Sequence, residues 1–145
     1  MPDRTASTVW EGELATGKGT VTFDSSNAVD GLPVSWPARA ENPDGQTSPE
    51  ELIAGAHATC YAMSLAGQLK RRGHAAERLE VSATVTIDKV ESGFGITRSA
   101  LTVRATVPGV EQADFDEAAQ AAKEGCPVSK ALAGNVEISL DARLG

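Results

Sequence analysis

The sequence predicts an α+β domain built mainly from antiparallel sheet. Short strand-like segments fill residues 7–38, and a long apolar helix follows at about 48–72. Two alternating strands and a second helix come after it, so strands and helices are segregated rather than alternating as β-α-β units. The 145 residues suit a single domain spanning 1–145.

The N-terminal segment is expected to form a meander of short strands. Residues 9–14 and 20–23 flank a glycine-containing turn at 15–19, which is the pattern of a hairpin. Pro33 and Pro37 mark an edge strand or a bend, because proline cannot donate to a sheet ladder. Residues 40–47 form a polar loop.

A strong helix-start signal follows this loop. Ser48 is the expected N-cap, Pro49 takes the first helical position, and Glu51 falls where a capping-box carboxylate belongs. The helix is expected to run to about Arg72 and to end at Gly73. It is apolar on most sides and rich in alanine and glycine, so we expect it to be central and suited to a helix–helix dimer interface.

The C-terminal half alternates in the manner of half-buried strands. Residues 79–87 and 101–107 alternate apolar and polar side chains around a turn at 91–95. A second helix is expected at 112–124, and Cys126 can cap a short third helix that begins at Pro127. Residues 136–140 form the last predicted strand.

Charge and hydropathy exclude several classes of partner. The net charge is −7 and the pI is about 4.8, whereas nucleic acids and anionic membranes bind basic surfaces. The N-terminus has no apolar run, and no stretch reaches the roughly 18 apolar residues of a membrane span. We therefore expect a cytoplasmic protein, in which the two cysteines are either packing residues or a redox device.

Cys60 lies inside the long helix and needs help to react. A free thiol is only about 3% ionised at neutral pH, and an apolar setting suppresses ionisation further. No lysine or arginine occurs in residues 40–69, so Arg39 is the natural activating cation. Its planar fork suits both the sulfur and an oxygen of a bound peroxide.

Glu50 is the candidate partner of Arg39. It lies in the first turn of the long helix, where the dipole stabilises a carboxylate, and it can hold a guanidinium by two hydrogen bonds. Glu50 and Cys60 are ten residues apart, which is about 15 Å along a helix. If both serve one site, two antiparallel copies of the helix must bring them together, and this predicts a functional dimer.

Cys126 follows Gly125 at an expected helix N-terminus, where free amides favour a thiolate. As a resolving thiol it would attack a sulfenic acid at Cys60 and form a reducible disulfide. Other interpretations are a zinc site made of His57, Cys60, His74 and Cys126, or a Cys–His hydrolase using His57. Paired ligand spacing is absent, and nothing recognisable in the sequence orients the imidazole.

Four stretches resemble the osmotically inducible protein C (OsmC) family, within the OsmC/Ohr superfamily of thiol-dependent hydroperoxide reductases. They are residues 10–12 (WEG), 48–60 (SPEELIAGAHATC), 88–97 (DKVESGFGIT) and 125–129 (GCPVS). The third stretch, and an arginine just before the helix, resemble OsmC proper more than the Ohr branch.

The resemblance implies an intertwined homodimer with two peroxidatic sites at its interface and no metal or flavin. It implies that Cys60 is the peroxidatic cysteine, that Cys126 is the resolving one, and that Arg39 and Glu50 are the activating pair. Substrates would be organic hydroperoxides, with hydrogen peroxide poorer, and the reductant a small dithiol or lipoyl-bearing protein rather than thioredoxin. The rival hypothesis is a non-catalytic, stress-associated protein that binds a hydrophobic small molecule.

Overall fold

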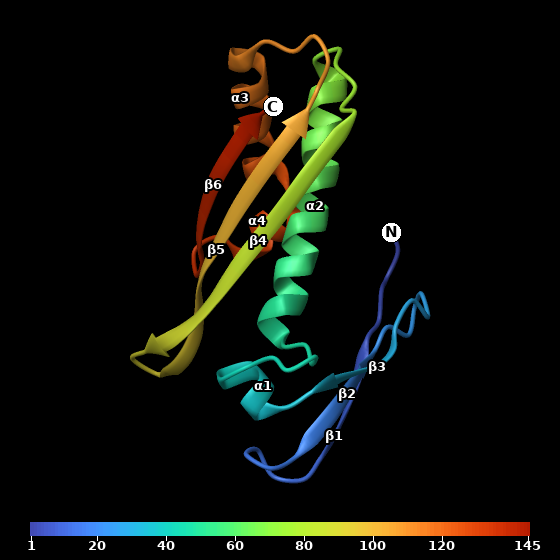
Figure 1. Cartoon of the computed structure of the whole chain (residues 1–145), viewed down its shortest axis with the longest axis vertical. Helices are drawn as coiled ribbons and strands as arrows, with labels where there is room; N and C mark the ends of the chain where they lie inside the picture. The colour runs from blue at the N-terminus through green and yellow to red at the C-terminus, as the bar shows by residue number, and fades with distance from the viewer. The chain divides into compact units, whose positions relative to one another are not determined.

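The computed structural model describes all 145 residues, and its contacts divide the chain into two compact units, residues 1–52 and 53–145. The first unit contains three strands, a short helix and the first turn of a long helix (Figure 1). These are β1 (Ser7–Glu11), β2 (Lys18–Thr22), β3 (Asp30–Val34), α1 (Trp36–Ala40) and the start of α2 (Pro49–Arg71). The second unit contains the rest of α2, then β4 (Arg78–Val90), β5 (Gly93–Thr106), α3 (Gln112–Gly125), α4 (Pro127–Leu132) and β6 (Glu137–Leu144).

The predicted N-terminal meander is confirmed. The strands are ordered β1-β2-β3 and both pairs are antiparallel. Gly19 lies opposite Trp10, and a β-carbon at Gly19 would come within 2.8 Å of the indole ring, so this position needs glycine. Pro33 lies on the edge strand β3, as expected for a residue without an amide hydrogen.

Helix α1 was not predicted, because the sequence indicated only strands and a bend up to residue 38. Ser35 is its N-cap and accepts a hydrogen bond from the amide of Ala38 at 3.3 Å, while Pro37 occupies the first turn. Proline suits that position, since its fixed φ is helical and the amide there has no intrahelical partner. Five residues are too few to show a helical period in the sequence. Arg39 lies in the last turn of this helix.

Helix α2 begins and ends where the sequence indicated. The amide of Glu51 donates to the hydroxyl of Ser48 at 3.1 Å, and Gly73 has a φ of +87° just after the end. The expected capping box is incomplete, because the carboxylate of Glu51 accepts instead from the hydroxyl of Thr47 at 2.8 Å. No helix is long and apolar enough to cross a membrane.

The sheet of the second unit has the order β4-β5-β6. The β4–β5 hairpin is antiparallel, as predicted, with a turn at residues 91–92 that is shorter than expected. Strand β6 pairs with β5 in parallel, so β5, α3, α4 and β6 form a crossover unit. This corrects the expectation that no β-α-β unit occurs. The alternation located β6 but could not give its direction, which depends on where the two helices return the chain.

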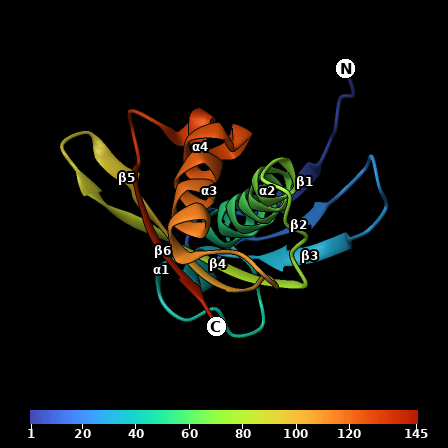
Figure 2. The ribbon, with the colours of Figure 1, turned by 90° about the horizontal axis from the view of Figure 1, so that it is seen from above.

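Helices α2 and α3 lie on the same face of this sheet and enclose the core with it (Figure 2). Each element contributes fully buried side chains, namely Tyr61, Leu65 and Leu69 from α2, Leu101, Val103 and Ala105 from β5, and Phe115, Ala118 and Ala122 from α3. The hydroxyl of Tyr61 donates to the carbonyl of Ala119 at 2.9 Å. This bond fixes α2 against α3, immediately before the segment that carries Cys126.

Candidate active site

The fold of the second unit brings the two cysteines together. Cys60 is half-buried on α2, whereas Cys126 is fully buried at the N-cap position of α4. Both are free thiols, and their side chains interact with each other. The fold thus places two residues that are distant in the sequence next to each other.

The surroundings of the two thiols have opposite effects on ionisation. Burial raises the pKa of Cys60, and its hydrogen bond to Cys126 raises it further, against a smaller lowering by the amide of Val128. Burial also opposes ionisation of Cys126, but hydrogen bonds from Cys60 and from the amide and hydroxyl of Ser129 outweigh it and lower the pKa of Cys126. Within this unit, negative charge is favoured on Cys126, and Cys60 needs a further activating group.

The first unit holds the predicted activating pair. Nε of Arg39 lies 3.1 and 3.2 Å from the two carboxylate oxygens of Glu50, and Nη2 lies 2.7 Å from Oε1. The side chain of Glu50 is 9% exposed and that of Arg39 is 32% exposed. The bidentate pair expected from the sequence is present, and the guanidinium keeps part of its surface for another partner. The four predicted residues thus form two pairs, one in each unit.

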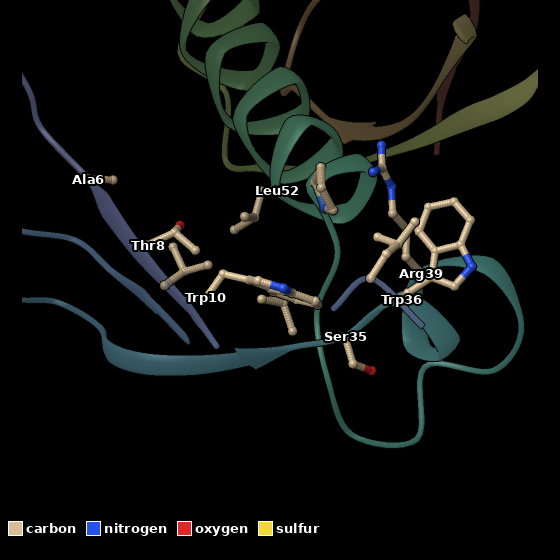
Figure 3. A pocket seen from close by; sticks show the side chains of 11 residues that line it. Ala6, Thr8, Trp10, Ser35, Trp36, Arg39 and Leu52 are labelled. Atoms are coloured by element: carbon tan, nitrogen blue, oxygen red, sulfur yellow. The ribbon is translucent and has the colours of Figure 1, made fainter. Parts of the chain in front are cut away.

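An open cavity of about 650 Å³ lies beside Arg39 in the first unit. Its lining is largely apolar and includes Trp10, Trp36 and Leu52, and Arg39 is the only charged residue in it (Figure 3). Cζ of Arg39 lies 5.9 Å from the centre of the Trp36 ring, within the range of a cation–π contact. An apolar hollow with one cation suits an organic molecule that carries a polar, electron-rich end.

His57 is fully buried, and both of its ring nitrogens have partners. Nδ1 lies 2.7 Å from the hydroxyl of Ser99 on β5, and Nε2 lies 2.8 Å from the hydroxyl of Ser129 on α4. Burial lowers the pKa of His57, so the ring is neutral near pH 7. No local pattern in the sequence indicates what orients this imidazole, and in the structure the hydroxyls of Ser99 and Ser129 do so.

The zinc interpretation finds no support in these contacts, because the nitrogens of His57 already face hydroxyl groups. His74 lies elsewhere, with Nε2 3.7 Å from the carboxylate of Asp114. No cluster of three or more histidine, cysteine, aspartate or glutamate side chains is arranged to hold a metal ion.

Comparison with known proteins assigns the family. The family model of the OsmC-like protein matches residues 42–141. The chain belongs to the OsmC-like family. Peroxiredoxin OsmC of Escherichia coli strain K12 is 42% identical over 135 residues, which cover 93% of this chain and 92% of that protein. Organic hydroperoxide resistance protein OhrA of Bacillus subtilis strain 168 is 32% identical over 120 residues, covering 81% and 83%.

A solved OsmC/Ohr structure has the same fold. The organic hydroperoxide resistance protein OhrB of Bacillus subtilis matches with a TM-score of 0.72 and 28% identity, over 96% of this chain and 98% of that chain. The α+β fold predicted from the sequence pattern is therefore confirmed.

Sequence reasoning missed two serines in this OsmC-like chain. Ser99 shares its strand face with Leu101 and Val103, so the period of two in β5 turns its hydroxyl into the core. Ser129 is the third residue of α4 and is 4% exposed. A polar residue in register with core positions is the signal that could have identified Ser99. Ser129 belongs to residues 125–129, one of the stretches that resemble the OsmC family, but the sequence indicated no role for it.

Proposed function

We propose that this protein is a thiol-dependent peroxidase that reduces organic hydroperoxides to alcohols, and hydrogen peroxide more weakly. The contact between the free thiols of Cys60 and Cys126 carries the proposal, because a cysteine that is oxidised by a peroxide needs a second thiol within reach. The printed names of the relatives, a peroxiredoxin and organic hydroperoxide resistance proteins, support the same activity.

The proposed reaction has three steps. The thiolate of Cys60 attacks the distal oxygen of the hydroperoxide, the O–O bond breaks, and the alkoxide leaves and takes a proton to become the alcohol. Cys60 is then a sulfenic acid, which Cys126 attacks with loss of hydroxide to give a disulfide. An external dithiol reduces the disulfide through a mixed disulfide and is itself oxidised.

Arg39 and Glu50 would activate the first step. Because burial raises the pKa of Cys60, a nearby cation is needed to stabilise the thiolate. Arg39 is held by Glu50 through three contacts and still exposes part of its guanidinium. In this proposal the pair of one chain serves Cys60 of a second chain, since Glu50 and Cys60 are separated by about 15 Å of helix.

The dimer proposal is supported by apolar side chains that are exposed in each unit. Trp10 and Leu14 are exposed in the first, and Met63, Val90 and Phe94 in the second, with Met63 at 72%. A contact with a second chain would remove such surface from water, at about 25 cal/mol per Å².

Substrate and reductant follow from the same features. The apolar cavity beside Arg39 favours hydroperoxides with an organic substituent over hydrogen peroxide. We expect a small dithiol or a lipoyl-bearing protein as reductant, in the cytoplasm, where thiols are kept reduced. The chemistry requires no cofactor or metal, and the chain would act as a single domain.

The cavity also favours a second candidate, a protein that binds a hydrophobic small molecule without catalysis. A steady-state assay with cumene hydroperoxide, tert-butyl hydroperoxide and hydrogen peroxide, each with excess dithiothreitol or dihydrolipoamide, separates the two. A peroxidase consumes many equivalents of hydroperoxide per chain, whereas a binding protein consumes at most one. Cys60→Ser is the control and should remove all turnover. Turnover retained in that variant would contradict the assignment of Cys60.

A further inference from the structure

A line of buried polar side chains leads through the core of the second unit to Cys126. It begins at Ser99, whose hydroxyl lies 2.7 Å from Nδ1 of His57. It continues from Nε2 of His57 to the hydroxyl of Ser129, 2.8 Å away. Ser129 lies three residues after Cys126 in the first turn of α4, and its hydroxyl interacts with the Cys126 thiol. All four residues, Cys126 included, are at most 4% exposed.

Burial of these polar groups in an apolar core costs free energy, and filling space is not a sufficient reason for their presence. A hydroxyl or imidazole in an apolar core must find a partner, and an aliphatic side chain of similar size would fill the same space without that requirement. Here each group is satisfied by the next, and the line ends on a sulfur atom that the proposed reaction uses. Ser99, His57 and Ser129 have no role in the oxidation of Cys60.

We propose that Ser99, His57 and Ser129 form a hydrogen-bond relay that stabilises the thiolate of Cys126 when it attacks oxidised Cys60. In this proposal Ser129 is a catalytic residue, because its hydroxyl interacts with the reacting sulfur. His57 and Ser99 are positioning residues that orient that hydroxyl. This inference rests on the proposed peroxidase cycle and concerns its second step.

When Cys126 is a thiolate, each hydrogen bond of the relay donates in the direction of its sulfur. The burial of His57 keeps its ring neutral, with one donor and one acceptor nitrogen. When Nε2–H donates to the oxygen of Ser129, the hydroxyl hydrogen of Ser129 is directed to Cys126. Nδ1 then accepts from the hydroxyl of Ser99. Hydrogen bonds in series polarise one another, so the last donor is strengthened.

In the resolution step, the thiolate of Cys126 attacks the sulfur of the Cys60 sulfenic acid, the S–S bond forms, and the S–O bond breaks. Hydroxide leaves and takes a proton from solvent to become water. In the reductive step an external dithiol attacks the sulfur of Cys60, and Cys126 departs as a thiolate toward the hydroxyl of Ser129. Both steps therefore place negative charge on the atom where the relay ends.

Few other groups titrate near this sulfur. Cys60 and Tyr61 of α2 interact with Cys126 directly, and His57 joins through Ser129, while β5 contributes the hydroxyl of Ser99. Burial raises the pKa of Tyr61, the only tyrosine of the chain, so its phenol stays protonated over the working range.

The relay makes a distinctive prediction for the pH profile of resolution. If Ser129→Ala raises the pKa of Cys126 by about one unit, the thiolate fraction below the pKa falls about tenfold. The remaining thiolate is about threefold more nucleophilic, because the Brønsted coefficient is about 0.4–0.5. Resolution should therefore be about threefold slower near neutral pH and about threefold faster at high pH, so the two profiles cross.

Two measurements test the relay. In a Cys60→Ser background, which keeps a hydroxyl beside Cys126, thiolate absorbance against pH reports Cys126 alone. In chains with both cysteines, one equivalent of cumene hydroperoxide is mixed rapidly, and sulfenic acid and disulfide are quantified at timed intervals by dimedone trapping and mass spectrometry. Ser129→Thr restores the hydroxyl and should restore the profile. His57→Gln keeps one amide donor and should give an intermediate shift.

Ser64→Ala is the matched control. The hydroxyl of Ser64 is partly buried on α2, but it donates to the carbonyl of Ala122 at 3.2 Å and is not part of the relay. It should leave the profile unchanged. A Ser129→Ala profile that is uniformly slower, or unchanged, would overturn the relay, because a purely structural defect produces no crossing. If the wild-type protein formed no sulfenic acid or disulfide, the peroxidase proposal itself would fail, which is a separate result.

Discussion

Replacement of Arg39 by alanine removes the only charged side chain that lines the apolar cavity and leaves Glu50 without its partner. In the proposed dimer it also removes the cation that favours ionisation of Cys60. The environment of Cys60 within its own unit raises its pKa, through burial and through the hydrogen bond to Cys126. The variant should therefore have a less acidic Cys60 and a slower first step.

The magnitude of the effect follows from simple electrostatics. Two unit charges about 4 Å apart attract by about 4 kcal/mol at an effective dielectric constant of about 20. About 2.7 kcal/mol of this would change the pKa of Cys60 by about two units. With a Brønsted coefficient of about 0.4–0.5, as found for thiol exchange, the oxidation rate at neutral pH should fall about tenfold.

The same substitution should destabilise the fold. Loss of one partner from a buried ion pair costs about 3–5 kcal/mol, and we expect about 2 kcal/mol here because the side chain of Arg39 is 32% exposed. Arg39→Lys keeps the charge but loses the fork, so it should recover only part of the rate. Denaturant unfolding measured beside the kinetics separates the two effects.

Thiolate absorbance titration in a Cys126→Ser background measures Cys60 alone. Arg78→Ala is the matched control, because Arg78 also pairs with a glutamate, Glu80, but at the surface with 70% of its side chain exposed. An unchanged pKa of Cys60 in Arg39→Ala would show that Arg39 does not activate this thiol.

Three further predictions concern the dimer and the core. Inactive Glu50→Arg and Cys60→Ser proteins, mixed under subunit exchange, should regain up to about half of wild-type activity per heterodimer, because one site would combine wild-type Glu50 with wild-type Cys60. No recovery, despite exchange seen by native mass spectrometry, would exclude a shared site. His57 has a lowered pKa in the folded state, so the unfolded chain binds more protons below pH about 6.5, and stability should fall as pH falls through that value. His57→Gln should remove this part of the acid sensitivity in urea unfolding, and an equal sensitivity would contradict it. Tyr61→Phe removes the hydrogen bond to Ala119 and should lower the free energy of unfolding by about 1–3 kcal/mol; a change near zero would show that the carbonyl finds another partner.

Much of the fold could be predicted from local patterns. The cap at Ser48, the stop at Gly73 and the alternation in β4 and β5 are properties of neighbouring residues, and they placed α2 and the central hairpin. Helix α1 and the parallel pairing of β6 could not be predicted in the same way. The first is too short to have a period, and the second depends on where α3 and α4 return the chain.

The candidate site shows the same division. The pairing of Arg39 with Glu50 was expected, since the first turn of a helix favours a carboxylate and few cations lie nearby. The contacts of His57 with Ser99 and Ser129 join three distant segments, and no local pattern announces them. Such polar contacts within a core become visible only when the packing is known.

Identification of the oxidised cysteines after a single turnover tests the proposed peroxidase mechanism. Reduced protein is treated with one equivalent of cumene hydroperoxide, and the products are analysed by intact-mass and peptide mass spectrometry without reductant. We expect one equivalent of cumyl alcohol, loss of the two thiol hydrogens from each chain, and a disulfide between Cys60 and Cys126 of the same chain. A Cys126→Ser protein should instead stop at the sulfenic acid of Cys60. Oxidation confined to Cys126, or a Cys60 that stays reduced while the hydroperoxide is consumed, would contradict it.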